Sequence, residues 1–410
     1  MASILFKNAR IIDGTSDRPK DPVDVFVEDN LIREVGPNIT AHAKTVFDLS
    51  SRYLMPGLID CHVHVVAGVA NLGLNATFPD SLVMARSIRI QEGMLRRGFT
   101  TVRDVGGADY GQVKAWEEGL VKGPRLVISG KALSQSGGHC DFRGPFNSGP
   151  YYYAQRLGSI GRICDGPDEV RRFTREEIKG GAKFVKVMAN GGVASPTDPI
   201  HFLGFSIQEL KVAVEEARNA GTYVAAHLYT DDAIRRAVEC GVHSLEHCNL
   251  IQSETAQFAA QQGAIAVPTL VVYDKIATIG EELGMGASAV SKVKSVRTAG
   301  MESISIMHNA GLTLAYGSDL LGEMHQFQSE EFVLRGQVMP AHNVIASATS
   351  VGAKLCKMEG QIGTIAAGAF ADMLVLEANP LEDLSVLGNQ GAQMSAIMQN
   401  GLFAKCNLGA

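Results

Sequence analysis

From about residue 56 to residue 350, the sequence alternates short apolar runs with longer stretches of helical periodicity. One of the expected helices has a capping box at its start, Ser206 with Glu209, and a glycine, Gly221, at its end. Such alternation is typical of a parallel α/β fold. Eight units in series predict a TIM-type (β/α)8 barrel, with its chemistry at the carboxyl ends of the strands. The expected strands are 58–65, 100–104, 125–129, 184–188, 223–227, 243–247, 264–269 and 313–319.

The two ends of the chain have a different pattern, with short β-type runs and little helical periodicity. Pairing the ends with each other is the simplest way to bury both. We therefore expect a small discontinuous β-sandwich domain, formed by 1–55 and 358–410, beside a barrel domain of 56–357. The expected terminal strands are 4–12, 23–27, 31–35, 45–49, 363–365, 372–376, 396–399 and 402–406.

Composition narrows the class of partner. With 410 residues, 46% of them hydrophobic, the chain can bury a large core. The net charge of −6, the pI near 6.0 and the absence of a Lys/Arg run argue against a nucleic-acid or anionic-membrane surface, so we expect a small-molecule partner. Seven scattered cysteines without a CxxC pair fit a reducing compartment. Because no run of 18 apolar residues and no leader-like segment is seen, the expected location is the cytoplasm.

The first expected strand of the barrel ends in two histidines spaced two apart, His62 and His64. Successive strand residues point to opposite faces, so these two side chains share a face with Asp60. Their Cα atoms would lie about 6.6 Å apart, and two imidazoles can converge from there on one ion at about 2.1 Å. Taken alone, such a pair is more often two histidines on a half-buried strand, so the metal site depends on the residues that follow along the chain.

Other polar residues stand at the ends of later strands. His227 and His247 are candidate ligands for a second metal, being imidazoles at separate strand ends. Asp319 is a candidate ligand and general acid/base, although an aspartate here could also cap the next helix. His243 shares a face with His247 and is expected to be a core histidine or a neighbour of a ligand. Glu246 is expected to point outward and to be structural.

Lys186 lies inside the apolar run 184–188, where a charged amine without a partner would be unfavourable. Near bound cations its amine would be neutral and could capture carbon dioxide. The resulting carbamate is chemically a carboxylate that could bridge two metals about 3.5–4 Å apart. The alternatives are a buried lysine paired with an acidic residue, or a bridging role for Lys183, which we expect to stay solvated.

Several blocks of the sequence resemble the amidohydrolase superfamily, in particular its binuclear zinc branch with a carboxylated lysine. These blocks are PGLIDCHVHV, FVKVMANGGVASPTDP, VAAHLYTDDAIRRAVECGVHSLEHCNLI, AYGSDLLGE and GTIAAGAFADMLVL. They look most similar to the Xaa-Pro dipeptidases (prolidases) and related carboxypeptidases, with ochratoxinase-like amidases as neighbours.

The resemblance implies a ligand set and an assembly. It implies two divalent metal ions, with zinc the expected element, and a homo-oligomer. One metal would be bound by His62, His64 and Asp319, the other by His227 and His247, with carboxylated Lys186 bridging them.

Four further residues are candidates for substrate binding. His139 resembles the family histidine that polarises the scissile carbonyl, and Tyr229 resembles a tyrosine that contacts the ligand. The long aromatic loop 143–162 is expected to be a lid. Its Arg143 and Arg156 are candidates for gripping a substrate carboxylate.

These inferences predict a metal-dependent hydrolase of amide bonds. The expected substrate is a dipeptide such as L-Xaa-L-Pro, or an N-acyl amino acid, attacked by a metal-bridging hydroxide while Asp319 passes the proton to the leaving amine. The enzymatic alternatives are an ochratoxinase-like amidase and an imidazolonepropionase-like cyclic-amide hydrolase with one metal. A non-enzymatic scaffold of the same fold is disfavoured, because it has no reason to keep this ligand set.

Overall fold

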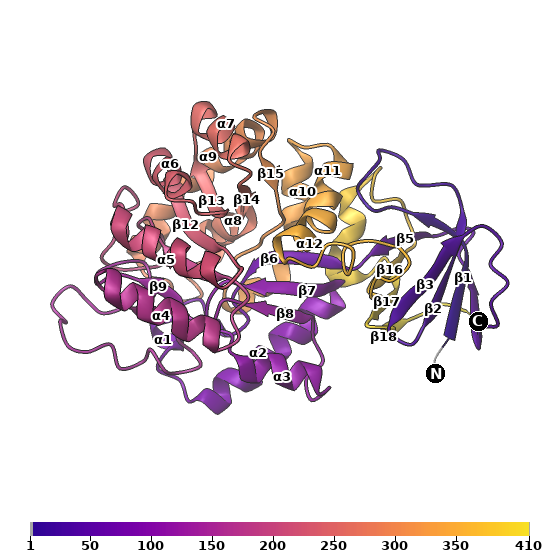
Figure 1. Cartoon of the computed structure of the whole chain (residues 1–410), viewed down its shortest axis with the longest axis horizontal. Coiled ribbons are helices and arrows are strands. Elements are labelled where there is room, and N and C mark those ends of the chain that lie inside the picture. Colours follow the sequence, from indigo (N-terminus) through magenta and orange to yellow (C-terminus); the bar gives the residue numbers. More distant parts are fainter. Residues whose placement is uncertain (1–2, 410) are drawn as a thin grey trace.

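The computed structural model describes residues 3–409. Figure 1 shows a helix-rich body at one end of the molecule and a group of strands, with both chain termini, at the other. The body is α/β, with parallel strands at its centre and helices around them.

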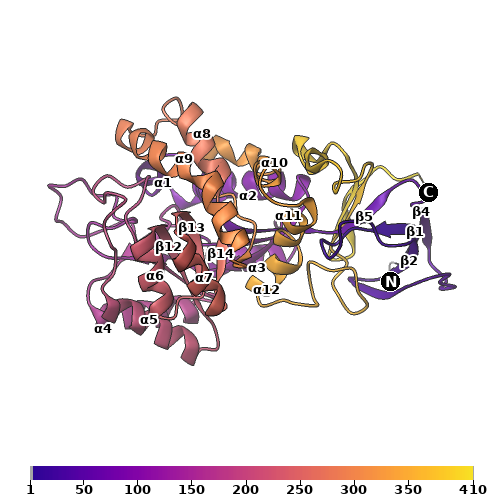
Figure 2. The same cartoon turned by 90° about the horizontal axis from the view of Figure 1, so that it is seen from above.

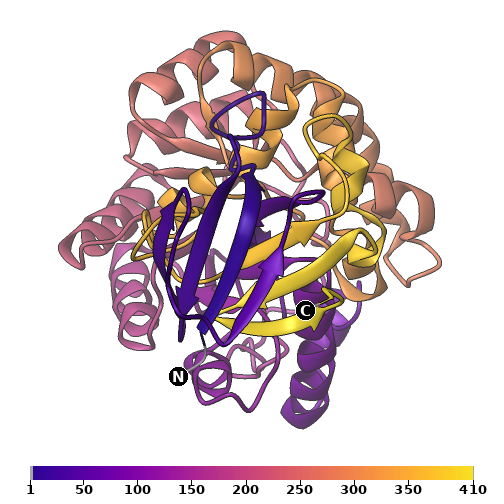
Figure 3. The ribbon, with the colours of Figure 1, turned by 90° about the vertical axis from the view of Figure 1, so that its right-hand side faces the viewer.

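The terminal strands form one eight-stranded sheet, in the order β18-β17-β16-β5-β1-β2-β3, with β4 paired to β1. The expectation that the two ends of the chain pair is confirmed, because β5 and β16 are antiparallel neighbours. In Figure 3 the C-terminal strands run obliquely to the N-terminal ones. The strands are β1 (Ser3–Ile11), β2 (Val23–Glu28), β3 (Leu31–Gly36), β4 (Thr45–Asp48), β5 (Tyr53–Pro56), β16 (Met373–Leu376), β17 (Met394–Gln399) and β18 (Leu402–Cys406).

The sheet has a hydrophobic core of its own. Phe6, Phe47 and Phe403 meet there, with ring centroids 5.8–6.4 Å apart. One sequence expectation is wrong: 363–365 is not a strand. Gly363 has a φ of 67°, which is incompatible with an extended strand, and a Cβ there would lie 2.4 Å from the Thr349 carbonyl oxygen.

Parallel strands form the centre of the body, in a three-stranded sheet, β6-β7-β8, and a seven-stranded sheet, β10-β9-β11-β12-β13-β14-β15. Backbone hydrogen bonds join the two sheets at both sides, from Cys61 N to Tyr316 O (2.7 Å) and from Lys183 N to Ile128 O (2.8 Å). Each of the eight expected strands overlaps an observed one, and β9 and β10 are additional. The bounds are β6 (Leu58–Val63), β7 (Phe99–Asp104), β8 (Arg125–Ile128), β9 (Ala132–Ser134), β10 (Gly161–Ile163), β11 (Val185–Met188), β12 (Val224–Thr230), β13 (Ser244–Leu250), β14 (Ile265–Val267) and β15 (Thr313–Leu314).

Helices surround these strands (Figure 2). The predicted capping box is present, because Ser206 accepts from the Glu209 backbone and the Glu209 side chain accepts from the Ser206 backbone. Within residues 3–409, no helix is both long and apolar enough to cross a bilayer. The α-helices are α1 (Leu72–Asn75), α2 (Asp80–Arg96), α3 (Tyr110–Glu117), α4 (Pro167–Lys179), α5 (Ile207–Asn219), α6 (Asp231–Glu239), α7 (Ser253–Gln261), α8 (Leu270–Ile279), α9 (Ala287–Asn309), α10 (Glu330–Gly336), α11 (Ala341–Ser347) and α12 (Ser350–Leu355). Three short 3-10 helices are η1 (Gly322–Phe327), η2 (Leu384–Leu387) and η3 (Asn389–Gly391).

Candidate metal centre and active site

His62 of β6, His64 directly after this strand and Asp319 beyond β15 converge on one point. The Nε2 atoms of His62 and His64 each lie 3.4 Å from Oδ1 of Asp319, and the three potential ligand atoms lie within 4.8 Å of one another. Ligands at about 2.0–2.2 Å from a common ion must lie within about 4.4 Å of each other, so His–Asp separations of 3.4 Å fit one divalent cation.

The other ring nitrogens of both histidines are held by buried acceptors. His62 Nδ1 donates to Oε2 of Glu246 (2.7 Å), and His64 Nδ1 donates to the carbonyl oxygen of Gly106 (2.8 Å). A hydrogen on Nδ1 leaves the Nε2 lone pair free for a metal, and the acceptor fixes the ring orientation. The protein thus presents both imidazoles in the tautomer that a cation requires.

The expectation that Glu246 points outward from its strand, away from the site, is wrong, because its carboxylate contacts His62. It is fully buried, and besides His62 it binds Arg103 Nη2 (2.7 Å) and Ser244 Oγ (2.6 Å). Strict alternation along β13 would send Glu246 and His247 to opposite faces, but His247 has a φ of 75°. This left-handed residue interrupts the alternation, so both side chains reach the site.

Asp319 also has a left-handed backbone, with a φ of 55°. Its N–H donates to the carbonyl oxygen of His62 (2.8 Å), which ties the segment after β15 to the strand that carries the histidines. Burial alone would raise the pKa of Asp319, but His62 and its neighbours His64 and His247 outweigh burial and hold this pKa well below its usual range. The carboxylate is therefore ready to bind a cation.

A second group of imidazoles lies beside the first. The ring of His247 is 4.7 Å from those of both His62 and His227, between centroids. His227 Nε2 donates to Gly191 O (3.2 Å), which leaves Nδ1 free, whereas His247 Nδ1 is bonded to Thr269 Oγ1 (2.8 Å), which leaves Nε2 free. Burial is the main cause that lowers the pKa of both rings well below the usual value. Both are neutral and able to act as ligands.

Lys186 lies in β11 and is 1% exposed. Burial lowers the pKa of its amine. Within residues 3–409 no carboxylate lies within the 4.0 Å limit of an ion pair with it, so a buried Lys–acid pair does not account for its position. Lys183 lies before the strand, and its N–H takes part in the junction of the two sheets.

His139 and Tyr229 both lie against His227. The rings of His139 and His227 are stacked, with centroids 4.1 Å apart, and Tyr229 meets His227 edge-on at 4.7 Å. His139 Nδ1 is bonded to Ser195 Oγ (2.7 Å), while the Tyr229 hydroxyl accepts from the Tyr273 hydroxyl (3.1 Å). The structure therefore gathers the predicted ligands, His139 and Tyr229 in one cluster.

The two candidate arginines of the loop 143–162 are occupied elsewhere. Arg143 pairs with Asp141 (2.6 Å) and donates to Gly149 O (2.6 Å), and Arg156 pairs with Asp80 (3.1 Å). The loop has no regular secondary structure before β10 and projects from the body (Figure 1), and its Phe146 is 99% exposed.

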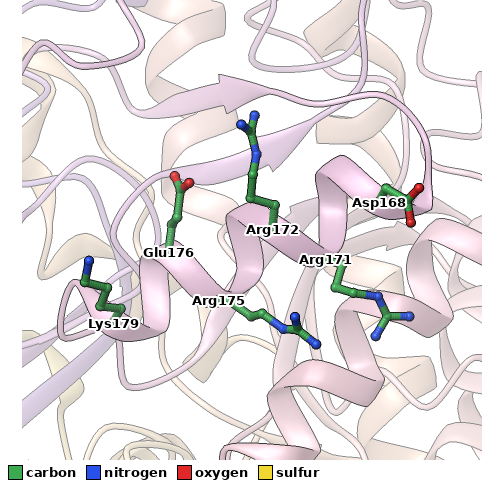
Figure 4. Close-up of a pocket in the computed structure, with 6 residues that line it drawn as sticks. All are labelled: Asp168, Arg171, Arg172, Arg175, Glu176 and Lys179. Carbon is green, nitrogen blue, oxygen red and sulfur yellow. The ribbon is translucent and has the colours of Figure 1, made fainter.

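Two hollows lie away from this cluster. One lies along α4, where Arg171 and Arg175 extend from the same side of the helix (Figure 4) and are paired with Glu216. The other is lined by Tyr223, His243, Lys354, Lys357 and Glu359. His243 precedes β13 and contacts the Tyr223 ring (5.3 Å between centroids), so it lies at the opposite end of the strand from His247.

Three comparisons place the chain among known proteins. The sequence pattern of the amidohydrolase family matches residues 53–399. An ochratoxinase from Aspergillus niger is 33% identical over 386 residues, which cover 88% of this chain and 78% of that protein. A crystal structure of a prolidase complexed with N-methylphosphonate-L-proline is 46% identical, with a TM-score of 0.97 over 99% of this chain and 100% of that one. A Xaa-Pro dipeptidase with bound methionine is 26% identical, with a TM-score of 0.85 over 98% of this chain and 100% of that one. The chain belongs to the amidohydrolase family, whose members generally use metal ions, and is a hydrolase that acts on amide bonds.

Proposed function

We propose that the protein is a dipeptidase that releases the C-terminal residue from L-Xaa-L-Pro or similar dipeptides and N-acyl amino acids. The observation that carries this proposal is the likeness, over nearly the whole chain, to the prolidase complexed with N-methylphosphonate-L-proline. The cluster of imidazoles, carboxylate and buried lysine supports it, because amide hydrolysis needs an activated water and a polarised carbonyl.

The donor set suits two divalent cations, with zinc the expected metal. His62, His64 and Asp319 would hold one, His227 and His247 the other, and Lys186 as a carbamate would bridge them. When bound, the cations would activate water at neutral pH and polarise the scissile carbonyl.

The chain's own residues would transfer the proton, stabilise the oxyanion and bind the substrate. Asp319 would take the proton of the attacking water and give it to the leaving nitrogen. His139 would donate to the carbonyl oxygen as negative charge develops on it, and Tyr229 would bind the substrate. Arg143 could bind the substrate carboxylate only by releasing Asp141.

The architecture proposed around this site is a closed (β/α)8 barrel of residues 56–357 and a small domain of 1–55 and 358–410. The hydrogen bonds at both junctions of the parallel sheets and the separate core of the terminal sheet support it. Assembly into a homo-oligomer is part of the proposal.

The test is amino-acid release by zinc-loaded protein across an L-Xaa-L-Xaa library that includes Xaa-Pro and N-acyl-phenylalanine members. Preferred release of proline supports the dipeptidase. If no dipeptide is hydrolysed although two metals are bound per chain, the dipeptidase proposal is contradicted. That result favours an aryl amide substrate of the ochratoxin type, which the 33% identity to ochratoxinase supports. Metal content near one per chain would favour a mononuclear cyclic-amide hydrolase of the imidazolonepropionase type.

A further inference from the structure

We propose that the loop 191–198 is a positioning element for His139, and that Lys292 of α9 holds this loop in place. The inference rests on the proposed function, because it assigns Ser195, Asp198 and Lys292 to the geometry of the residue that would polarise the carbonyl. The loop follows β11 and connects it to α5.

Ser195 and Asp198 fix the side of the His139 ring that faces the loop. The Ser195 hydroxyl donates to Oδ1 of Asp198, so its oxygen is left to accept from His139 Nδ1 (2.7 Å). Oδ2 of Asp198 lies 3.4 Å from the same Nδ1 and accepts from the Gly192 N–H (2.9 Å). This chain of donors places a hydrogen on Nδ1, toward the loop, and leaves Nε2 to face the substrate. Nε2 can donate to the oxyanion when it carries a hydrogen as well, and the Asp198 carboxylate beside Nδ1 stabilises the positive charge of that form.

The loop backbone itself lies against the catalytic histidines. A Cβ at Gly192 would lie 1.8 Å from Nδ1 and Cε1 of His139, so only glycine allows this approach. The neighbouring carbonyl of Gly191 accepts from His227 Nε2 (3.2 Å). A shift of this loop would therefore displace His139 and reorient His227.

Lys292 binds the backbone of the loop 191–198. Its ammonium group donates to the carbonyl oxygens of Gly192 (3.0 Å), Ser195 (2.9 Å) and Asp198 (3.2 Å). An ammonium group has three N–H bonds, and these three carbonyls take all of them. Lys292 thus has no donor left for a substrate carboxylate, and its role is to fix the three residues that shape the His139 environment.

The kinetic test is a double-mutant cycle on the zinc-loaded enzyme with an Xaa-Pro substrate. His139→Asn should lower kcat/KM by roughly 100-fold, as loss of one oxyanion donor does. Asp198→Asn, which keeps the size of the side chain, should lower it by roughly 10- to 100-fold. The double variant should be within about threefold of His139→Asn alone, because residues that act as a unit are not additive. Multiplicative effects would overturn the proposal.

Lys292→Met keeps the aliphatic stem and removes the three donors. We expect kcat/KM to fall by about 3- to 10-fold, and the fall to disappear in the His139→Asn background. Lys294→Met is the matched control, because Lys294 is exposed on the same helix, and it should match wild type. Equal activity of the two methionine variants would overturn the role of Lys292. If Asp198→Asn does not fold, Ser195→Ala enters the same cycle.

A second readout does not depend on the substrate. Spectra of 15N-histidine-labelled, zinc-loaded protein report, for each ring nitrogen of His139, whether it carries a hydrogen. We expect Nδ1–H in wild type and a loss of that preference in Ser195→Ala and Asp198→Asn. The Nδ1–H state persisting in both variants would contradict the proposal. Failure of all Xaa-Pro hydrolysis with the expected spectra would reject the proposed substrate and leave the positioning role supported.

Discussion

The two halves of the candidate site are held in different ways. His62, His64 and Asp319 are fixed by the strands, through the Glu246 carboxylate, the Gly106 carbonyl and the backbone bond from Asp319 N to His62 O. His139 and His227 instead depend on the loop 191–198. The half that would bind the first cation and move the proton is therefore fixed by strands. The half that would bind the second cation and contact the substrate depends on the loop 191–198, and so on the residues that hold this loop.

The largest expected effect lies in the strand-held half. Asp319→Asn keeps the shape and one carbonyl oxygen but removes the group proposed to move the proton. We expect kcat to fall by roughly 100- to 10,000-fold with metal content unchanged. Steady-state kinetics and elemental analysis of the same preparation check this. Turnover near wild type would show that proton transfer does not need this half of the site.

Glu246→Gln tests whether the strand-held half needs its buried support. An amide cannot accept from both His62 and Arg103 as a carboxylate does. It also leaves the buried Arg103 charge without a negative partner, although Arg103 still donates to the Cys61 carbonyl oxygen. We expect metal affinity or kcat/KM to fall by roughly 10- to 100-fold, and the free energy of unfolding to fall by about 3–5 kcal/mol.

Urea unfolding and metal titration of Glu246→Gln are compared with Glu239→Gln, which breaks an exposed pair with Arg235. That control should cost less than about 1 kcal/mol. Equal effects of the two substitutions would mean that the buried pair is dispensable.

The same division explains what the sequence could predict. Period-two alternation places His62 and His64 on one face, and strand–helix alternation places the eight strands, because both depend on residues near in sequence. The expectation that Glu246 points outward is wrong because the left-handed backbone at His247 has no signal in the neighbouring sequence. Lys292 is about 100 residues from the loop that it holds, and no pattern in α9 indicates three carbonyl acceptors.

Tyr273→Phe tests the half that would contact the substrate, where Tyr229 lies against His227. A chain of hydrogen bonds runs from His247 through Thr269 and Tyr273 to Tyr229, where the Tyr273 hydroxyl donates to the Tyr229 oxygen. This leaves the Tyr229 hydrogen free for a substrate acceptor. Without the Tyr273 hydroxyl we expect KM to rise about 3- to 10-fold, because one hydrogen bond that orients Tyr229 is lost, while kcat should change little. Tyr110→Phe, at an exposed tyrosine, is the control. A fall in kcat at unchanged KM would contradict this role.

The smallest expected effect on turnover lies in a buried contact between the strand-held half and the loop 143–162. Lys131 donates to the carbonyl oxygens of Gly107 (3.4 Å), Arg156 (2.9 Å) and Ser159 (2.5 Å). It thus joins the segment next to Gly106, the acceptor of His64, to the loop 143–162. Burial lowers the pKa of Lys131 from 10.5 to about 8, more than the nearby Glu177 raises it. Between these two values the unfolded chain binds more protons than the folded one, so the free energy of unfolding should rise with pH from about 8 to 10.5. The rise from this group should be at most about 3.4 kcal/mol.

In Lys131→Met this rise should be absent, as urea unfolding at several pH values would show, whereas the exposed control Lys122→Met should follow wild type. Parallel curves for Lys131→Met and wild type would mean that this lysine is not desolvated in the folded protein, and that the loop meets the strand-held half through solvent rather than through a buried contact.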